Sequence, residues 1–126
     1  MVAAKPSILL IDDQEGIVNF LTVKLKGSGY RVSCARDGEK GLELARKTNP
    51  DLILLDIIMP GIDGIDVLRS LRQFSDVPVI VLSIAEGVNE KVMAMGATAF
   101  VSKPFDINEL MGLIKATLEP NCSPGE

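Results

Sequence analysis

The chain has 126 residues, of which 47% are hydrophobic and 24% are charged. This composition is typical of a globular domain and excludes a collagen-like or intrinsically disordered chain, and the length fits one domain with its own core. Asp and Glu (17) outnumber Lys and Arg (13), which gives a net charge of −4. Because nucleic acids are bound through basic surfaces, we expect no direct nucleic-acid binding by this domain.

The histidine and cysteine content excludes several classes of catalytic and metal-binding site. The chain has no histidine, which excludes histidine bases, Ser-His-Asp triads and His-ligated metal sites. Cys34 and Cys122 fit no metal-binding or redox spacing, so we expect free thiols in a reducing compartment, with Cys34 as a small buried hydrophobe. No apolar run approaches the ~20 residues of a membrane span, and no signal-peptide core follows Lys5. We therefore expect a cytoplasmic domain without membrane contact.

The first half of the chain predicts two strands and two helices. The apolar run Ile8–Ile11 is unbroken, as in strands buried on both faces of a parallel sheet. The next stretch predicts a helix that ends at Gly27, with an apolar stripe made of Ile17, Phe20, Leu21 and Leu25. Tyr30–Ala35 alternates polar and apolar residues, which is typical of an edge strand. Glu39–Lys47 predicts a short helix that stops before Pro50.

The second half predicts three more strands and three more helices. The strands are expected at Leu52–Leu55, Val79–Leu82 and, less apolar, Ala99–Ser102. One helix carries Ile65, Leu68 and Leu71 on one face; the next, Glu86–Met95, has few apolar anchors; and the last ends near Leu118. Asp106 and Glu109 have the spacing of a capping box at the start of that last helix. The segment 119–126 is rich in Pro, Gly and Ser and predicts a flexible tail or the start of a linker.

This alternation of strands and helices predicts a single α/β domain over residues 6–118. Repeated β-α units give right-handed crossovers, and therefore a doubly wound, five-stranded parallel sheet with helices on both faces. Ligands bind such sheets outside the carboxyl ends of the strands, so the residues that end each strand are the candidate site.

Polar residues stand at four of these strand ends. The first strand is followed by Asp12 and Asp13, the third by Asp56, the fourth by Ser83 and the fifth by Lys103. Neighbouring carboxylates repel one another unless a cation neutralises them. Because the site offers only oxygen ligands, it favours Mg²⁺ or Mn²⁺ over Zn²⁺.

A magnesium site of this kind points to phosphoryl chemistry. Mg²⁺ is usually shared between carboxylates and phosphate oxygens, and Lys103 and the Ser83 hydroxyl would serve the remaining phosphoryl oxygens. With no histidine or activated cysteine, a carboxylate is the expected nucleophile. The central strand position suits Asp56 as the acceptor and leaves Asp12 and Asp13 to the metal.

The same residues carry a family resemblance. Asp12-Asp13, Asp56 followed by Met59–Gly64, Ser83, and Lys103-Pro104-Phe105 resemble the receiver domain of bacterial two-component response regulators. Each piece occurs by chance, but the set is specific in this order and covers nearly the whole chain. The resemblance implies a flavodoxin-like sheet of strand order 2-1-3-4-5. It also implies a phosphorylation-dependent signalling switch, which dephosphorylates itself slowly and is not a conventional enzyme.

For the acid site, the resemblance implies specific roles. Asp56 would take a phosphoryl group from a phosphohistidine on a sensor histidine kinase or phosphotransfer protein. Asp12, Asp13, Asp56 and the backbone carbonyl of Ile58 would surround Mg²⁺.

For the switch, the resemblance implies that Ser83 and Lys103 hold the phosphoryl group while Phe100 turns inward. The peptide bond before Pro104 would be cis, and Gly64 would shape the loop after the acceptor. The changed surface around Phe100 and the last helix would control a downstream effector or an attached output domain. A phosphorylation-dependent homodimer is compatible with the family, and nothing in the sequence fixes it.

Three other functions are less well supported by the residues. A phosphatase of the haloacid-dehalogenase type usually has D-x-D after its first strand, whereas Asp12 and Asp13 are adjacent here, and it usually carries a cap domain, for which 126 residues leave no room. A flavodoxin-type carrier would need a loop that accepts a flavin phosphate, whereas the loop DDQEG is acidic. A degenerate receiver that only mediates protein contacts is disfavoured by the intact acids, although Ile84 keeps it open.

Ile84 provides a first testable prediction. The family usually has Ala or Gly after the serine, and a branched side chain there would obstruct the access of donor or water to Asp56. We expect slow phosphorylation or a long-lived phosphoryl state, and faster kinetics for Ile84→Ala in a phosphorylation and decay time course. Equal rates for the two proteins would refute this explanation.

Overall fold

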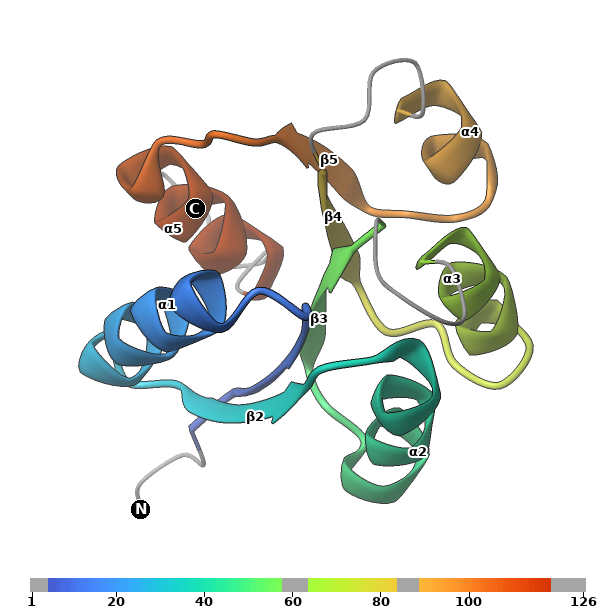
Figure 1. The fold of residues 1–126 in the computed structure, drawn as a ribbon, viewed down its shortest axis with the longest axis horizontal. Helices are drawn as coiled ribbons and strands as arrows, with labels where there is room; N and C mark the ends of the chain where they lie inside the picture. Colours follow the sequence, from blue (N-terminus) through green and yellow to red (C-terminus); the bar gives the residue numbers. More distant parts are fainter. Residues whose placement is uncertain (1–4, 58–63, 84–88, 119–126) are drawn as a thin grey trace, which may run out of the picture.

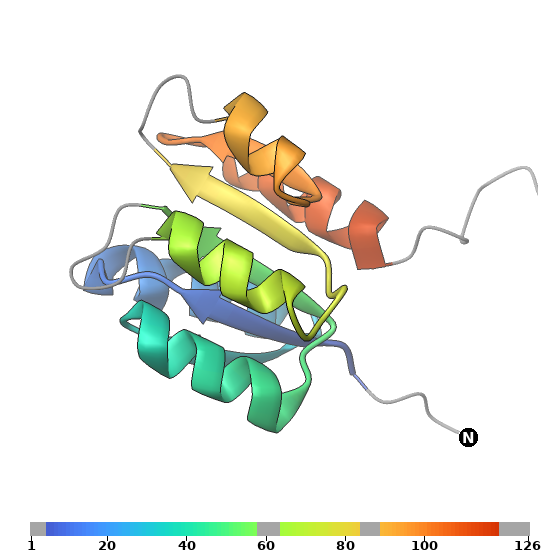
Figure 2. The ribbon, with the colours of Figure 1, turned by 90° about the vertical axis from the view of Figure 1, so that its right-hand side faces the viewer.

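Five parallel strands form a sheet at the centre of the molecule in the order β2-β1-β3-β4-β5 (Figure 1). This computed structural model describes residues 5–57, 64–83 and 89–118. The order is the predicted one, and the strands are β1 (Ser7–Ile11), β2 (Arg31–Ala35), β3 (Leu52–Asp56), β4 (Val79–Ser83) and β5 (Ala99–Ser102). Because every pair of neighbouring strands is parallel, all strands end at the same edge, and the arrowheads of β1 and β4 point the same way in Figure 2.

Helices cover both faces of this sheet. Helices α1 (Glu15–Gly27) and α5 (Ile107–Leu118) lie on one face, and α2 (Gly38–Thr48), α3 (Gly64–Arg72) and α4 (Asn89–Ala94) lie on the other (Figure 1). The predicted fourth helix began at Glu86, but residues 86–88 lie outside the described ones. In the described segments, no helix has the length and apolar character needed to cross a membrane.

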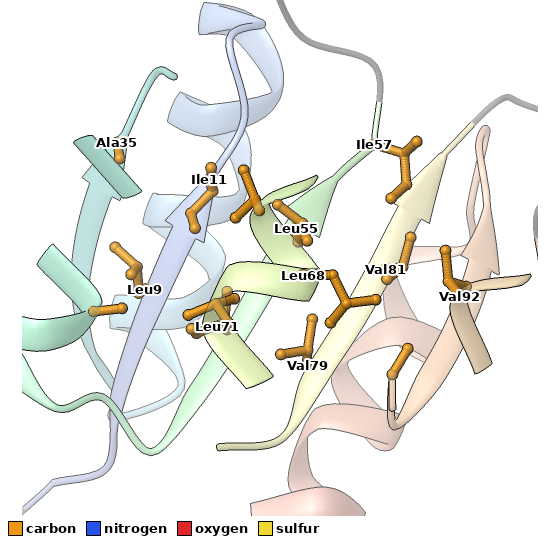
Figure 3. Close-up of a cluster of buried hydrophobic side chains, with 14 residues drawn as sticks. Leu9, Ile11, Ala35, Leu55, Ile57, Leu68, Leu71, Val79, Val81 and Val92 are labelled. Atoms are coloured by element: carbon orange, nitrogen blue, oxygen red, sulfur yellow. The ribbon is translucent and has the colours of Figure 1, made fainter. Parts of the chain in front are cut away.

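The unbroken apolar strands are buried on both sides, as predicted. Successive side chains of a strand point to opposite faces, so Ile8 and Leu10 join the core under α1 and α5, whereas Leu9 and Ile11 join the core under α2, α3 and α4 (Figure 3). Full burial of one such side chain contributes about 1.5–3 kcal/mol. Because apolar layers cover both faces of the sheet, polar side chains can gather only at the ends of the strands.

Two predicted core residues lie at the surface instead. Phe20 is 46% exposed, because α1 faces the sheet with Val18, Leu21 and Leu25 and each residue along a helix turns by about 100°. Cys34 is also exposed and is a free thiol whose Sγ lies 3.5 Å from Thr22 Oγ1. It lies on β2, which is the edge strand next to β1 in the described sheet. The prediction of Cys34 as a buried hydrophobe was therefore wrong, although the prediction of an edge strand is confirmed.

Side-chain caps begin two of the helices, and the second of them is the one that the sequence predicted. Asp37 accepts a hydrogen bond from the Lys40 N–H at the start of α2 (2.8 Å). Asp106 accepts from the N–H groups of Asn108 (2.8 Å) and Glu109 (3.1 Å) at the start of α5. Each such cap contributes about 1 kcal/mol.

Gly64 opens α3 in direct contact with the end of β3. Its N–H donates to the Ile57 carbonyl (2.9 Å), and an added Cβ would lie 2.5 Å from Ile57 Cα and 2.6 Å from the Asp56 carbonyl oxygen. Backbone atoms of the strand cannot yield as a flexible side chain does. Glycine is therefore required at position 64 because α3 packs closely against the backbone of β3, and not because the chain makes a left-handed turn there.

We expect Gly64→Ala to lower the free energy of unfolding by about 1–3 kcal/mol, because the methyl group would overlap the backbone next to Asp56. Gly112 is the matched control, since an added Cβ on this exposed residue of α5 would meet no atom within 4 Å. Gly112→Ala should raise stability by about 0.5–1 kcal/mol through helix propensity. Urea denaturation of the three proteins measures both effects. Equal stability of Gly64→Ala and the wild type would contradict the close-contact argument.

Candidate functional site

The sheet brings three carboxylates together at its carboxyl edge. Asp56 is the last residue of β3, and Asp12 and Asp13 directly follow β1. These strands are neighbours in parallel register, with Ile11 opposite Leu55. One carboxylate oxygen from each of the three acids lies within 4.8 Å of the other two. The predicted convergence of these residues is confirmed.

Two of these acids are almost inaccessible to solvent. Asp12 is 1% exposed and Asp56 is 5% exposed, whereas Asp13 is half-buried. Removing a carboxylate from water is costly unless charge or hydrogen bonds compensate it. The cluster therefore depends on a cation.

Lys103 supplies that cation from the end of β5. Its ammonium Nζ lies 3.0 Å from Asp12 Oδ2 and 3.5 Å from Asp56 Oδ2, and its side chain is only 8% exposed. The Lys103 N–H donates to the Ser83 carbonyl (2.9 Å), and the following peptide bond to Pro104 is cis, as the family resemblance implied. One ammonium offsets one of the three carboxylates, so the cluster retains negative charge for a further cation.

Gln14 takes part in this cluster, although no motif in the sequence points to it. Its N–H donates to Asp12 Oδ1 (2.9 Å), and its side-chain Oε1 accepts from Lys103 Nζ (3.4 Å). It occupies the N-cap position of α1 without capping the helix through its side chain. The only sequence signal was its place directly after the acid pair.

The donor set fits Mg²⁺ or Mn²⁺. The clustered ligands are carboxylate oxygens, which hard divalent cations of this size prefer. Ile58, predicted to add a backbone carbonyl, lies outside the described residues, as do Ile84 and the segment 59–63. The described part of the site is thus a set of three acids with one compensating ammonium.

Ser83 stands on β4, next to the strand of Asp56, and Phe100 stands on β5, one strand further away. Ser83 ends β4 and is fully buried, and β4 pairs with β3 so that Leu82 stands opposite Asp56. Phe100 on β5 stands opposite Val81 and packs, partly buried, on the core under α2, α3 and α4. On its other side lies a hollow of about 540 Å³ whose lining includes Pro104, Phe105, Glu109 and Leu113.

Comparison with known proteins gives a family match over most of the chain. Residues 8–115 match the model of the response regulator receiver domain. This range includes every residue of the acid site, together with Ser83, Phe100 and Lys103.

Solved structures resemble the chain over nearly its whole length. The receiver domain of the Francisella response regulator 1452 is 32% identical with a TM-score of 0.87, and the match covers 92% of this chain and 98% of that one. Response regulator TrrA from Thermotoga maritima, solved in complex with Mg²⁺-BeF, is 32% identical with a TM-score of 0.82 and coverages of 89% and 98%. A chain described as a response regulator from Chloroflexus aurantiacus is 31% identical with a TM-score of 0.84 and coverages of 90% and 98%.

The position of Lys103 predicts an effect on metal binding. Its ammonium lies on the carboxylates that a divalent ion would use, so Lys103→Gln should tighten Mg²⁺ binding by about tenfold through the loss of charge repulsion. Titration of the protein with Mg²⁺ in a calorimeter measures the affinity. Lys115→Gln, an exposed position on α5, controls for the change in net charge. Unchanged or weaker Mg²⁺ binding by Lys103→Gln would show that the ammonium and the ion do not compete.

Proposed function

The chain belongs to the response regulator receiver domain family, and we propose that Asp56 is the residue through which it receives its phosphoryl group. Receiver domains are the phosphoryl-accepting switches of two-component systems, so that general function holds for this chain. The observation that carries the assignment is the environment of Asp56. It is a buried carboxylate at the end of β3, in one cluster with Asp12 and Asp13 and 3.5 Å from the Lys103 ammonium.

The acid cluster supports a magnesium-dependent transfer. Receiver domains bind Mg²⁺ in an acidic pocket, and Asp12, Asp13 and Asp56 would hold the ion here, with the Ile58 carbonyl that the family pattern adds. When bound, Mg²⁺ neutralises negative charge on the carboxylates and on the phosphoryl oxygens. Mn²⁺ would serve the same role.

The chain's own residues perform the remaining steps. An Asp56 oxygen forms a bond to phosphorus while the bond from phosphorus to the donor nitrogen breaks. The electron pair of that bond stays on the donor's imidazole ring, which takes up one proton from water and leaves as neutral imidazole. The Lys103 ammonium, paired with Asp12 and Asp56 in this structure, then pairs with a phosphoryl oxygen. The Ser83 hydroxyl donates to another.

The donor and the output follow from this role. We infer a sensor histidine kinase or phosphotransfer protein as the donor, which supplies the histidine that this chain lacks. Attraction of Ser83 toward the phosphoryl group would let Phe100 turn inward and would reshape the surface between β5 and α5. The reader of that surface is a downstream effector, an output domain attached beyond residue 118 or a second copy of the domain. Slow self-dephosphorylation in the cytoplasm resets the switch.

The direct test is intact mass after incubation with Mg²⁺ and a small acyl-phosphate donor. We expect the wild type to gain one phosphoryl group, because the acids, the ion and Lys103 together stabilise the transfer. Asp56→Asn should gain none, and a chelator should prevent the gain in the wild type. Asp76→Asn, an exposed aspartate on the loop after α3, should behave as the wild type.

Two outcomes would contradict the proposal. Phosphorylation of Asp56→Asn at the wild-type level would place the acceptor elsewhere. A wild type that gains no phosphoryl group from either the small donor or a panel of phosphorylated histidine kinases would favour the degenerate receiver that only mediates protein contacts.

A further inference from the structure

Helix α4 is held by fewer buried side chains than its neighbours. Among the described residues it spans only Asn89–Ala94 and buries a single side chain, Val92, whereas α3 buries three apolar side chains besides Gly64. A helix of this length is not stable by itself. Contacts from other elements must therefore fix its position.

Such a contact stands at the carboxyl end of α4. Arg72, the last residue of α3, donates two hydrogen bonds to the Gly96 carbonyl, from Nε (3.1 Å) and Nη2 (2.9 Å). A third bond runs from its Nη1 to the Ser75 carbonyl (3.1 Å). The planar guanidinium thus joins the end of α3 to the turn between α4 and β5, and these two helices are neighbours in Figure 1. Lysine could not reproduce this forked geometry.

The turn is shaped to receive the arginine. Gly96 has a φ of +99°, and an added Cβ would lie 3.0 Å from Arg72 Nε and 3.2 Å from its Cδ. Arg72 is partly buried, which lowers the pKa of its guanidinium, while the carboxylate of Asp76 raises it. The side chain stays charged at neutral pH, so its bonds to the carbonyl are charge-assisted.

The next residues tie the same turn to the sheet. The Thr98 N–H donates to the Val79 carbonyl (2.8 Å), and the Val79 N–H donates to Thr98 Oγ1 (3.1 Å). These contacts lie at the amino edge of the sheet, whereas the acid cluster lies at the carboxyl edge. Strand β5 connects the two edges, because it begins at Ala99 and ends one residue before Lys103.

We propose that Arg72 is a positioning residue that makes the turn between α4 and β5 the fixed point of the switch. With the turn pinned, a change at Lys103 and Phe100 alters β5 near the acid cluster and does not reach Gly96. Without the arginine, the turn would move with the site. This proposal rests on the proposed phosphoryl switch. It adds that the structural change caused by phosphorylation ends at the turn between α4 and β5.

The first test compares hydrogen exchange in unphosphorylated wild type, Arg72→Lys and Arg69→Lys. The amides of Met95, Gly96 and Ala97 are hydrogen-bonded, so their exchange reports opening of the turn. We expect these amides to exchange about tenfold faster in Arg72→Lys, with β1 and β3 unchanged, because charge-assisted bonds to a carbonyl are lost. Arg69→Lys is the matched control. Arg69 lies on the same helix and forms a surface ion pair with Asp66, in which the two side chains are 58% and 51% exposed.

The second test adds the acyl-phosphate donor and Mg²⁺. In the wild type, phosphorylation should change exchange in β5 from Phe100 onward and leave Gly96 and Ala97 protected, whereas in Arg72→Lys both regions should change. The positioning role would be overturned if the turn amides of Arg72→Lys exchanged as slowly as those of the wild type. It would also be overturned if exchange in Arg72→Lys were faster by the same factor throughout the sheet. Absence of a phosphoryl gain by mass, with the small donor and with the panel of phosphorylated kinases, would refute the proposed function instead. The comparison of the unphosphorylated proteins would still decide whether Arg72 holds the turn.

Discussion

The ion pairs of Lys103 with Asp12 and Asp56 are the interaction on which the site depends. Two of the three clustered acids are almost fully buried, and in that environment their repulsion would be strong without a cation. The ammonium reaches them from β5, two strands away from β3 in the sheet. It therefore links the carboxyl ends of strands β1, β3 and β5 through its two ion pairs. The same ammonium is available for a phosphoryl group, so the residue that stabilises the resting cluster is also the one that would respond to its modification.

The apolar sheet explains why the charges gather where they do. Strands β1, β3 and β4 have essentially no exposed surface, so their carboxyl ends are the first positions at which an acid reaches other polar groups. Gly64 preserves this edge, since its missing side chain lets α3 begin against the backbone of Asp56 and Ile57. The apolar core and the acid site are thus parts of one arrangement. A change in the packing of α3 would displace the acceptor.

The two edges of the sheet have different roles in this view. The charged groups of the proposed phosphorylation site lie at the carboxyl edge, and Arg72 contacts backbone carbonyl groups at the opposite edge. Strand β5 runs between them with Phe100 in its middle. Because β5 is short and held at its amino end, a change at its carboxyl end would alter the surface next to that end. The hollow between β5 and α5 is part of this surface.

The sequence by itself determined the strand-helix order, the parallel sheet and the acids at its carboxyl edge, because unbroken apolar runs and the residues that follow them are local patterns. The strand order and the roles of Ser83 and Phe100 came from the family resemblance. Only the tertiary structure decided which side chains are exposed and which hydrogen-bond partners they have, because both depend on residues that are distant in the chain. Phe20 is exposed because α1 faces the sheet with other residues, and Cys34 is exposed because β2 has a strand on one side only. Gln14 and Arg72 acquire their partners, Lys103 and Gly96, only when the strands and helices are assembled. The first pair is separated by 89 positions and the second by 24, so no local sequence pattern could predict these contacts.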